Sequence, residues 1–218
     1  MLFCAARLVR ATLAFGLCLC AVAPAGAETF EATVPIAYAN VMRSINPHLA
    51  SGQSRTYAGV LLASAKRLNV DPALMMAVVT VESHWNARAV SIHGAEGLGQ
   101  LKPDTAHELG VDPRSGAGNL RGLAIYLHRM LALFHEARQP IREALAGYNA
   151  GPNAVRAYGG IPPYGQARRY VSKVMKALAM VRKRLGPDVV AAAGNRTQSD
   201  ATIARLAHAD AAFWGVAR

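Results

Sequence analysis

DPALMMAVVTVES, residues 71–83, is the stretch that decides the predicted fold. Asp71 is a typical helix N-cap and Pro72 a typical first helical residue, so a helix is expected to begin here and to run to about Trp85. Residues 73–81 are almost all apolar, which predicts a helix packed in the interior. Glu82 follows at the end of this apolar run.

Glu82 is the first candidate for chemistry. Met75, Val78 and Glu82 lie at positions i, i+3 and i+7, so they share one face of the helix. A carboxyl on a buried face loses solvation, which favours its protonated form and raises its pKa. Such a group suits a general acid that protonates a glycosidic oxygen. The alternative is a solvated residue at the helix end, as most helical glutamates are.

Two polar segments bounded by glycine are candidates to face this helix. In GAEGLGQLKP, residues 94–103, glycines allow close approach of a ligand, and Gln100 offers a donor and acceptors to a sugar. In AGYNAGPNAV, residues 146–155, Tyr148 offers a hydroxyl or a stacking surface and Asn149 an amide. Each segment alone also fits an ordinary loop or a helix end followed by a turn.

The fold class predicted from the rest of the chain is all-α. Helical periodicity or helix signals cover residues 54–68, 102–109, 119–137, 141–148 and 167–185, and no alternating run indicates a sheet. We expect a leader (1–27), a flexible N-terminal extension (28–52), one helical domain (53–186) and a low-order, flexible tail (187–218). Within the tail, residues 203–214 have an amphipathic helical pattern that would either dock on the domain or bind a partner.

The leader has the three parts of a secretory signal peptide. Arg7 and Arg10 precede a short apolar stretch, and Ala25-Gly26-Ala27 is a cleavage motif. We therefore expect cleavage after Ala27, a periplasmic or secreted protein, and no stable membrane span after cleavage. An uncleaved anchor is the alternative, although the apolar stretch is short for a span. All three cysteines lie in the leader, so the mature chain would have neither a disulfide nor a thiol nucleophile.

The charge balance indicates an anionic partner. The full chain carries a formal net charge of +11, and loss of the two leader arginines leaves +9. An exported basic protein is attracted to cell-wall polymers and anionic lipid surfaces. Nucleic acid is not expected, because aromatic residues are few and do not interleave with the basic ones. The seven histidines are scattered and no nucleotide or phosphate motif occurs, so neither a metal nor a cofactor is expected.

Five motifs in order carry a resemblance to a known family. They are ES (82–83), S-x-x-GAxGLxQLxPxTA (91–106), G-x-x-x-YL (122–127), YNAGP (148–152), and IPPY (161–164) followed by YV (170–171). Over about residues 69–185 the chain resembles lytic transglycosylases of the soluble-lytic-transglycosylase (SLT) type, which are glycoside hydrolase family 23-like. The resemblance implies an all-α, lysozyme-like catalytic domain related to goose-type lysozyme.

The resemblance also implies a reaction on peptidoglycan. Family members cleave the β-1,4 bond from N-acetylmuramic acid to N-acetylglucosamine. One glutamate, matching Glu82, first donates a proton to the leaving oxygen and then accepts one from the C6 hydroxyl of the muramic residue, which gives a 1,6-anhydro sugar. Ser83 would lie beside the reacting sugar, Gln100 would hold it, and Tyr148 and Asn149 would position it or Glu82. The substrate-binding residues carried over by motif are Ser83, Ser91, Gln100, Tyr148, Asn149 and Tyr170.

Two alternatives to this function stay open. A muramidase on the same fold would need a second carboxylate, since ordinary glycosidases use two, and Glu96 and Asp104 are the nearest candidates. Glu96 is expected to be exposed. A non-catalytic glycan-binding assembly protein is the other alternative. The small predicted domain suggests local wall opening for a secretion, conjugation or pilus machine, although a housekeeping enzyme would have the same features.

The chain departs from the family pattern at four positions. Gly99 and Lys102 stand where methionines are usual, and Gln166-Ala167 stands where Glu-Thr is usual. We expect Gly99 to remove a side chain from the cleft wall and Lys102 to add charge near the site. The neutral Gln166 is expected to weaken a contact to substrate or to Tyr148.

Overall fold

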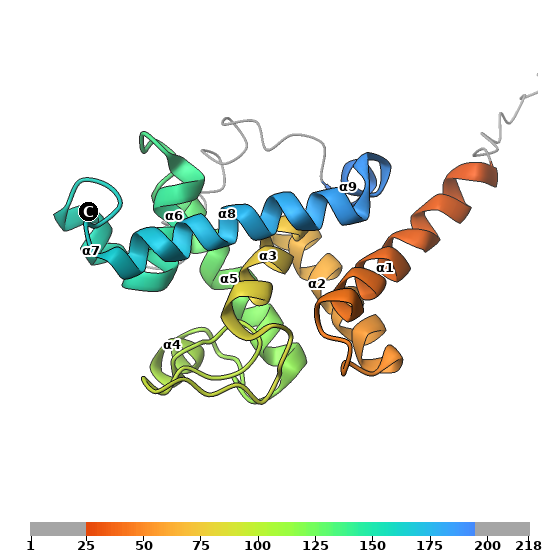
Figure 1. Ribbon diagram of the computed structural model, residues 1–218, viewed down its shortest axis with the longest axis horizontal. Coiled ribbons are helices and arrows are strands. Elements are labelled where there is room, and N and C mark those ends of the chain that lie inside the picture. The colour runs from red at the N-terminus through yellow and green to blue at the C-terminus, as the bar shows by residue number, and fades with distance from the viewer. Residues whose placement is uncertain (1–24, 195–218) are drawn as a thin grey trace, which may run out of the picture.

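Helices joined by loops make up the described part of the chain, which in this computed structural model is residues 25–194, with side chains described from residue 32. The helices are α1 (Ala25–Ile45), α2 (Ser51–Leu68), α3 (Pro72–Ser83), α4 (Pro103–Glu108), α5 (Gly116–Leu133), α6 (Pro140–Ala150), α7 (Pro152–Ala157), α8 (Gly165–Leu185) and α9 (Pro187–Ala193) (Figure 1). Between residues 25 and 194, β structure is limited to isolated bridges from Glu96 to Val90 and Leu101. The all-α prediction is confirmed.

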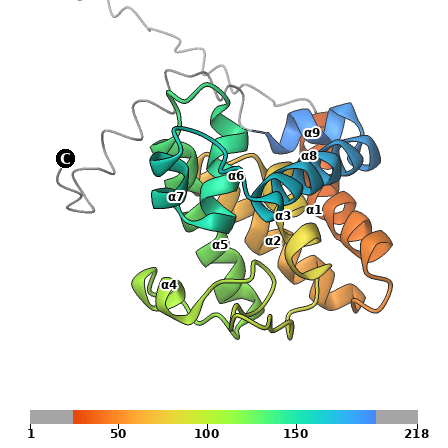
Figure 2. The same cartoon turned by 60° about the vertical axis from the view of Figure 1, so that its left-hand side comes forward.

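The long helix α8 lies across α3, which runs through the middle of the fold. α3 and α8 pack on each other, and α2 packs on both α1 and α5. Figures 1 and 2 show α6 and α7 gathered near the N-terminal end of α8, with α9 at its other end. α4 and the long loop before it lie on the far side of α3 from α8 (Figure 1).

α3 is buried along almost its whole length. Residues 72–80 are all buried, and the side chain of Asp71 caps the helix by accepting from the backbone N–H of Ala73 at 2.7 Å. Arg182 of α8 donates to the same carboxylate at 2.6 Å. Burial of each larger apolar side chain stabilises the fold by roughly 1.5–3 kcal/mol. The helix that carries Glu82 is therefore a rigid core element.

The N-terminal part of the fold begins earlier than predicted. The flexible extension expected over residues 28–52 is instead α1 and the first residues of α2, and Tyr38 and Met42 of α1 are fully buried. Arg184 of α8 donates to the hydroxyl of Ser44 at 2.9 Å. Pro35 inside α1 removes one backbone donor, and such a proline weakens a helix prediction from sequence.

The C-terminal tail also differs from the prediction at its start. α8 ends at Leu185, the next residue, Gly186, has a φ of +80°, and Pro187 then begins α9, which contacts α8 and α1. The rest of the predicted tail, with its amphipathic segment at 203–214, and residues 1–24 of the predicted signal peptide lie outside the described residues. Among the helices of the described region, none has the length and apolar character that crossing a membrane requires.

Candidate active site

Glu82 occupies the last turn of α3, and the chain turns sharply directly after it. α3 ends at Ser83, because His84 (φ +49°) and Trp85 (φ +65°) both adopt left-handed backbone conformations. These conformations are unfavourable for residues with side chains, and packing compensates here. Trp85 is 1% exposed, and its indole N–H donates to the hydroxyl of Thr80 at 3.3 Å. The buried tryptophan thus fixes the end of the helix next to Glu82.

The Glu82 carboxyl is half-buried and has a raised pKa. Burial raises its pKa from 4.5 to about 7, while a hydrogen bond from Tyr170 acts in the opposite direction. The Tyr170 hydroxyl, on α8, donates to Oε1 of Glu82 at 2.7 Å. A carboxyl with this pKa is partly protonated at neutral pH and is able both to give and to take a proton.

A cleft of about 480 Å³ opens beside Glu82. The loop before α4, the start of α4, the middle of α5, the end of α6 and the start of α8 surround it. The lining residues are Glu82, Ser91, His93, Ala95, Gln100, Leu101, Lys102, Thr105, Tyr126, Tyr148, Asn149, Ala150, Gly151 and Gln166. The fold therefore brings five of the seven predicted site residues to one cavity: Glu82, Ser91, Gln100, Tyr148 and Asn149.

Tyr148 connects the end of α6 to the glycine-rich loop. Its buried hydroxyl donates to the backbone oxygen of Gly99 at 2.8 Å. Its ring packs on that of Tyr126 with centroids 5.1 Å apart. Burial, followed by the charge of nearby Glu82, holds the pKa of Tyr148 well above its ordinary value. Tyr148 is therefore a neutral hydroxyl that holds the loop against the helical part of the cleft.

Gln100 and Ser91 stabilise the loop that forms one side of the cleft. Gln100 has a φ of +49°, and its amide N–H group donates to the backbone oxygens of Ala89 at 3.1 Å and Gly97 at 3.0 Å. No described residue donates to its amide oxygen, which leaves that oxygen available to a ligand. The Ser91 hydroxyl accepts from the backbone N–H of Ala95 at 3.0 Å.

Asn119 holds the same loop from behind and was not predicted as a site residue. It is fully buried at the start of α5, and its side-chain oxygen accepts from the backbone N–H of Gly99 at 2.6 Å. Its side-chain nitrogen donates to the backbone oxygens of Glu96 and Pro113, both at 2.8 Å. A polar residue among the apolar positions of α5 was the available signal in the sequence. Tyr126, His93 and Thr105, which line the cleft, were also missed as site residues.

Ser83 and Tyr170 do not line the cleft. The Ser83 hydroxyl donates to the backbone oxygen of Leu98 at 2.8 Å, which ties the end of α3 to the loop. Tyr170 is buried and directs its hydroxyl to Glu82. The geometry gives both residues a positioning role, whereas the family resemblance predicted that they bind the sugar.

The four departures from the family pattern lie in different environments. Lys102 and Gln166 line the cleft, whereas Ala167 is buried and does not line it. Gly99 is different from the expectation: a Cβ at this position would lie 2.7 Å from Cδ1 of Leu123 and 3.1 Å from the hydroxyl of Tyr148. Position 99 therefore faces the packed interior, and its glycine accommodates Leu123 rather than opening the cleft wall.

Among residues 32–194, whose side chains the structure describes, Glu82 is the only acidic residue that lines the cleft. Glu96, which was expected to be exposed, has a side chain only 16% exposed and pairs with Arg114 at 3.3 Å. Asp104 is exposed on α4 and is not among the residues that line the cleft. Within the described residues no group of histidine, cysteine or acidic side chains is arranged to hold a metal ion. The arrangement offers acid–base chemistry by one carboxyl.

Similar proteins were found by sequence. A transglycosylase of Enterobacteria phage PRD1 is 35% identical over 136 residues, which are 61% of this chain and 46% of that protein. The membrane-bound lytic murein transglycosylase F 1 of Alkalilimnicola ehrlichii is 38% identical over 113 residues, covering 50% of this chain and 23% of that protein. The chain thus spans less than half the length of these curated relatives.

Similar structures and a family model were also found. The 70 kDa soluble lytic transglycosylase of Escherichia coli superposes with a TM-score of 0.56 at 22% identity, covering 73% of this chain and 31% of that one. An inactive mutant of the lytic transglycosylase Slt of Pseudomonas aeruginosa superposes with a TM-score of 0.51 at 23% identity, covering 69% of this chain and 30% of that one. At this identity the likeness shows the shared lysozyme-like fold. The family model described as "Transglycosylase SLT domain" matches residues 60–170, which include α3, the glycine-rich loop and the end of α6. The chain therefore belongs to the transglycosylase SLT domain family.

Proposed function

We propose that this protein is a lytic transglycosylase that cleaves the β-1,4 bond between N-acetylmuramic acid and N-acetylglucosamine in peptidoglycan. The observation that carries the proposal is the single carboxyl in the cleft, Glu82, whose pKa burial raises to about 7. Family membership supports the same reaction, and so does the similarity to proteins named as lytic murein transglycosylases.

The reaction uses Glu82 twice. The protonated carboxyl first donates its proton to the bridging oxygen, so the bond from muramic C1 to that oxygen breaks and N-acetylglucosamine leaves with a free hydroxyl. The C6 hydroxyl of the same muramic residue then attacks C1 and gives its proton to the Glu82 carboxylate. The product is 1,6-anhydro-N-acetylmuramic acid, and Glu82 regains its proton. Water is not consumed.

A pKa near 7 serves both steps. A carboxyl at its ordinary pKa would be almost fully ionised at neutral pH and would rarely hold the first proton. The intramolecular hydroxyl is already close to C1, and this proximity removes the need for a second carboxylate that activates water. Tyr170 donates to the ionised form of Glu82 and so stabilises the state that exists between the two steps.

The main alternative is a muramidase, which hydrolyses the same bond. Inverting glycosidases need a carboxylate about 6.5–9.5 Å from the acid, and retaining ones a nucleophile at about 5–5.5 Å. Glu96 is engaged with Arg114, and Asp104 does not line the cleft, so neither residue supports this alternative.

Mass spectrometry of the products tests the proposal. Purified protein digesting peptidoglycan should release fragments that end in 1,6-anhydro-muramic acid, one water lighter than hydrolysed fragments. Glu82→Gln should lower the turnover by several orders of magnitude. Asp104→Asn is the control: it removes the same charge and should leave the activity unchanged. Fragments with reducing ends would establish a hydrolase, and equal activity of Glu82→Gln would contradict the assignment of this residue.

We further propose a periplasmic or secreted location and a role in local wall opening for a secretion, conjugation or pilus machine. The predicted signal peptide supports the location. Deletion of the gene should impair such a machine while cell growth stays normal, and restoration should require Glu82. A general defect in wall turnover would instead indicate a housekeeping enzyme.

A further inference from the structure

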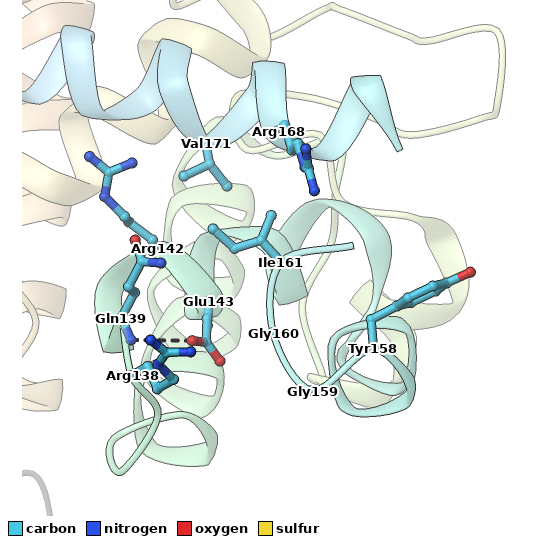
Figure 3. A pocket seen from close by; sticks show the side chains of 10 residues that line it. All are labelled: Arg138, Gln139, Arg142, Glu143, Tyr158, Gly159, Gly160, Ile161, Arg168 and Val171. Carbon is cyan, nitrogen blue, oxygen red and sulfur yellow. Dashed lines mark hydrogen bonds between the residues drawn. The ribbon is translucent and has the colours of Figure 1, made fainter. Parts of the chain in front are cut away.

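A second cavity of about 480 Å³ lies between the start of α6, the loop from α7 to α8, and α8 itself (Figure 3). Its lining differs from that of the cleft, with no residue in common. The side chains that matter for its chemistry are Arg138, Arg142, Arg168, Glu143, Tyr158 and Ile161. Ile161 belongs to the IPPY motif of the family resemblance, but neither that resemblance nor the proposed reaction gives the charged residues a role.

Three arginines line this cavity and have no side-chain partner in the part of the chain that the structure describes. Arg138 and Arg142 come from the start of α6 and the loop before it, and Arg168 comes from the first turn of α8. None of their guanidinium groups makes a hydrogen bond or an ion pair with another described residue. A guanidinium presents a planar set of donors that matches a carboxylate in bidentate geometry. The three guanidinium groups are therefore able to bind the carboxylates of a ligand.

Glu143 adds a carboxylate at the inner side of the same cavity. The residue is only 7% exposed, and one oxygen of its side chain accepts from the backbone N–H of Gln139 at 3.2 Å (Figure 3). The described residues donate no other hydrogen bond to this carboxylate, so its second oxygen remains available to a ligand in the cavity. Buried carboxylates are usually paired. An ammonium group of a ligand would complete this one.

The cavity thus suits a ligand that carries both carboxylates and an ammonium group. With three positive groups and one negative group around it, the ligand should be anionic overall. Stem peptides of peptidoglycan have this chemistry, since they carry several free carboxylates and, where their diamino acid is not cross-linked, an ammonium next to one of them. Peptide-free glycan carries one carboxylate on each muramic residue but no ammonium group, so only the stem peptide offers both groups that the cavity matches.

The second cavity is close to the cleft but separate from it. Gln166 lines the cleft and Arg168 the second cavity, and two residues along a helix differ by about 200° in direction. Glu143 and the cleft residue Tyr148 are five positions apart on α6, which is about 8 Å along its axis. Both cavities are therefore able to hold ligand at the same time, one on each side of the first turn of α8.

We propose that the cavity lined by Arg138, Arg168 and Glu143 is a binding site for the stem peptides of peptidoglycan, distinct from the cleft that holds the glycan. The inference rests on the proposed function for the nature of the polymer, and on the charges of the cavity for the part of the polymer that it recognises. The site anchors the protein to peptide-bearing wall while the cleft acts on a strand.

Calorimetric titration of the purified protein with a synthetic tripeptide tests the proposal. The probe is L-alanyl-γ-D-glutamyl-meso-diaminopimelate, and the comparison probe is the same peptide with its carboxylates amidated. The wild type should bind the free acid at least about tenfold more tightly than the amide, because bonds to charged groups are lost. The double variant Arg138→Gln/Arg168→Gln should weaken binding of the free acid by at least about tenfold.

Two further variants separate the site from general charge and from folding. Arg169→Gln removes one positive charge at the position of α8 next to Arg168, outside the cavity, and should change the Kd by less than about twofold, whereas Arg168→Gln alone should weaken binding more than this. Glu143→Gln keeps an oxygen that accepts from the Gln139 N–H but loses the negative charge. It should therefore weaken binding of the free-acid peptide and leave the unfolding temperature nearly unchanged. Equal loss in Arg169→Gln, equal binding of the amidated peptide, or no binding by the wild type would overturn the proposal.

A second readout separates this inference from the proposed function. Release of anhydro sugars from glycan stripped of its peptides should depend on Glu82 and be unaffected by Arg138→Gln/Arg168→Gln. Normal release without any peptide binding would overturn the peptide site alone. Peptide binding without release from any substrate would overturn the proposed reaction and leave the site standing.

Discussion

Replacing Glu82 by glutamine should make the protein more stable at neutral pH, at the expense of its activity. Folding raises the pKa of this carboxyl from 4.5 to about 7, so the folded protein holds a proton that the unfolded chain would release. Glutamine is close to the protonated carboxyl in shape, is never ionised, and keeps an oxygen that accepts from Tyr170. The substitution therefore removes the cost of a poorly solvated charge.

The size of the effect depends on pH in a defined direction. Below pH 4.5 the carboxyl is protonated in both states, and its charge costs nothing. Between pH 4.5 and 7 the unfolded chain ionises first, so the wild type loses stability as the pH rises. Above pH 7 the loss is complete and is at most about 3.5 kcal/mol, since the pKa rises from 4.5 to about 7 and one pKa unit corresponds to about 1.4 kcal/mol. Residual contact with water makes about 1–3 kcal/mol the expected range.

Denaturant unfolding of both proteins at pH 5 and pH 8 measures this difference. Glu82→Gln should gain about 1–3 kcal/mol over the wild type at pH 8 and clearly less at pH 5. In heating experiments the gain at pH 8 would raise the Tm by several degrees, at roughly 2–4 °C per kcal/mol for a domain of this size. A difference that is the same at both pH values, or a glutamine variant less stable at pH 8, would refute the reasoning about the carboxyl.

Three further predictions concern the neighbours of Glu82. Tyr170→Phe removes the donor to Oε1, so the pKa of Glu82 should rise further, and the alkaline limb of the pH profile of kcat/KM should move up by about one unit or more; an unmoved limb would show that this bond does not tune the acid. Gly99→Ala brings a Cβ to 2.7 Å from Leu123, so the variant should unfold at a lower denaturant concentration by about 1–3 kcal/mol, and Leu123→Ala should recover part of that loss when combined with it; additive losses would contradict the contact. Asn119→Ala leaves the Gly99 N–H unbonded, so it should destabilise the protein by about 1–3 kcal/mol and speed amide exchange in the 96–101 loop, which hydrogen exchange would detect.

The predictable part of this protein is the part whose signals are local. Asp71-Pro72 marks the start of α3 through capping chemistry that needs only neighbouring residues, and the structure has that cap. The apolar run after it predicts burial, and with it the raised pKa of Glu82. Five of the predicted site residues meet at one cleft, because ordered motifs carry information on a shared fold that no single motif contains.

The features that the sequence did not reveal depend on contacts between distant residues. The partner of the Ser83 hydroxyl is Leu98, and Asn119 bonds to the backbone of a loop 20 residues before it. The close approach of Gly99 to Leu123 likewise depends on how the loop packs on α5. α1 has a proline within it, and its burial follows from packing on α2 and α8 rather than from its own pattern.

The position of Glu82 at the C-terminal end of α3 has an electrostatic consequence of its own. The peptide dipoles of a helix add to give about half a negative charge at this end, which opposes ionisation of a nearby carboxyl by about 0.3–1 kcal/mol. Unlike the effect of burial, this contribution comes from backbone that does not move when a ligand enters or leaves. The helix itself thus favours the protonated acid whether the cleft holds solvent or sugar. A carboxyl placed at the N-terminal end of a helix would experience the opposite effect and would lose its proton at a lower pH.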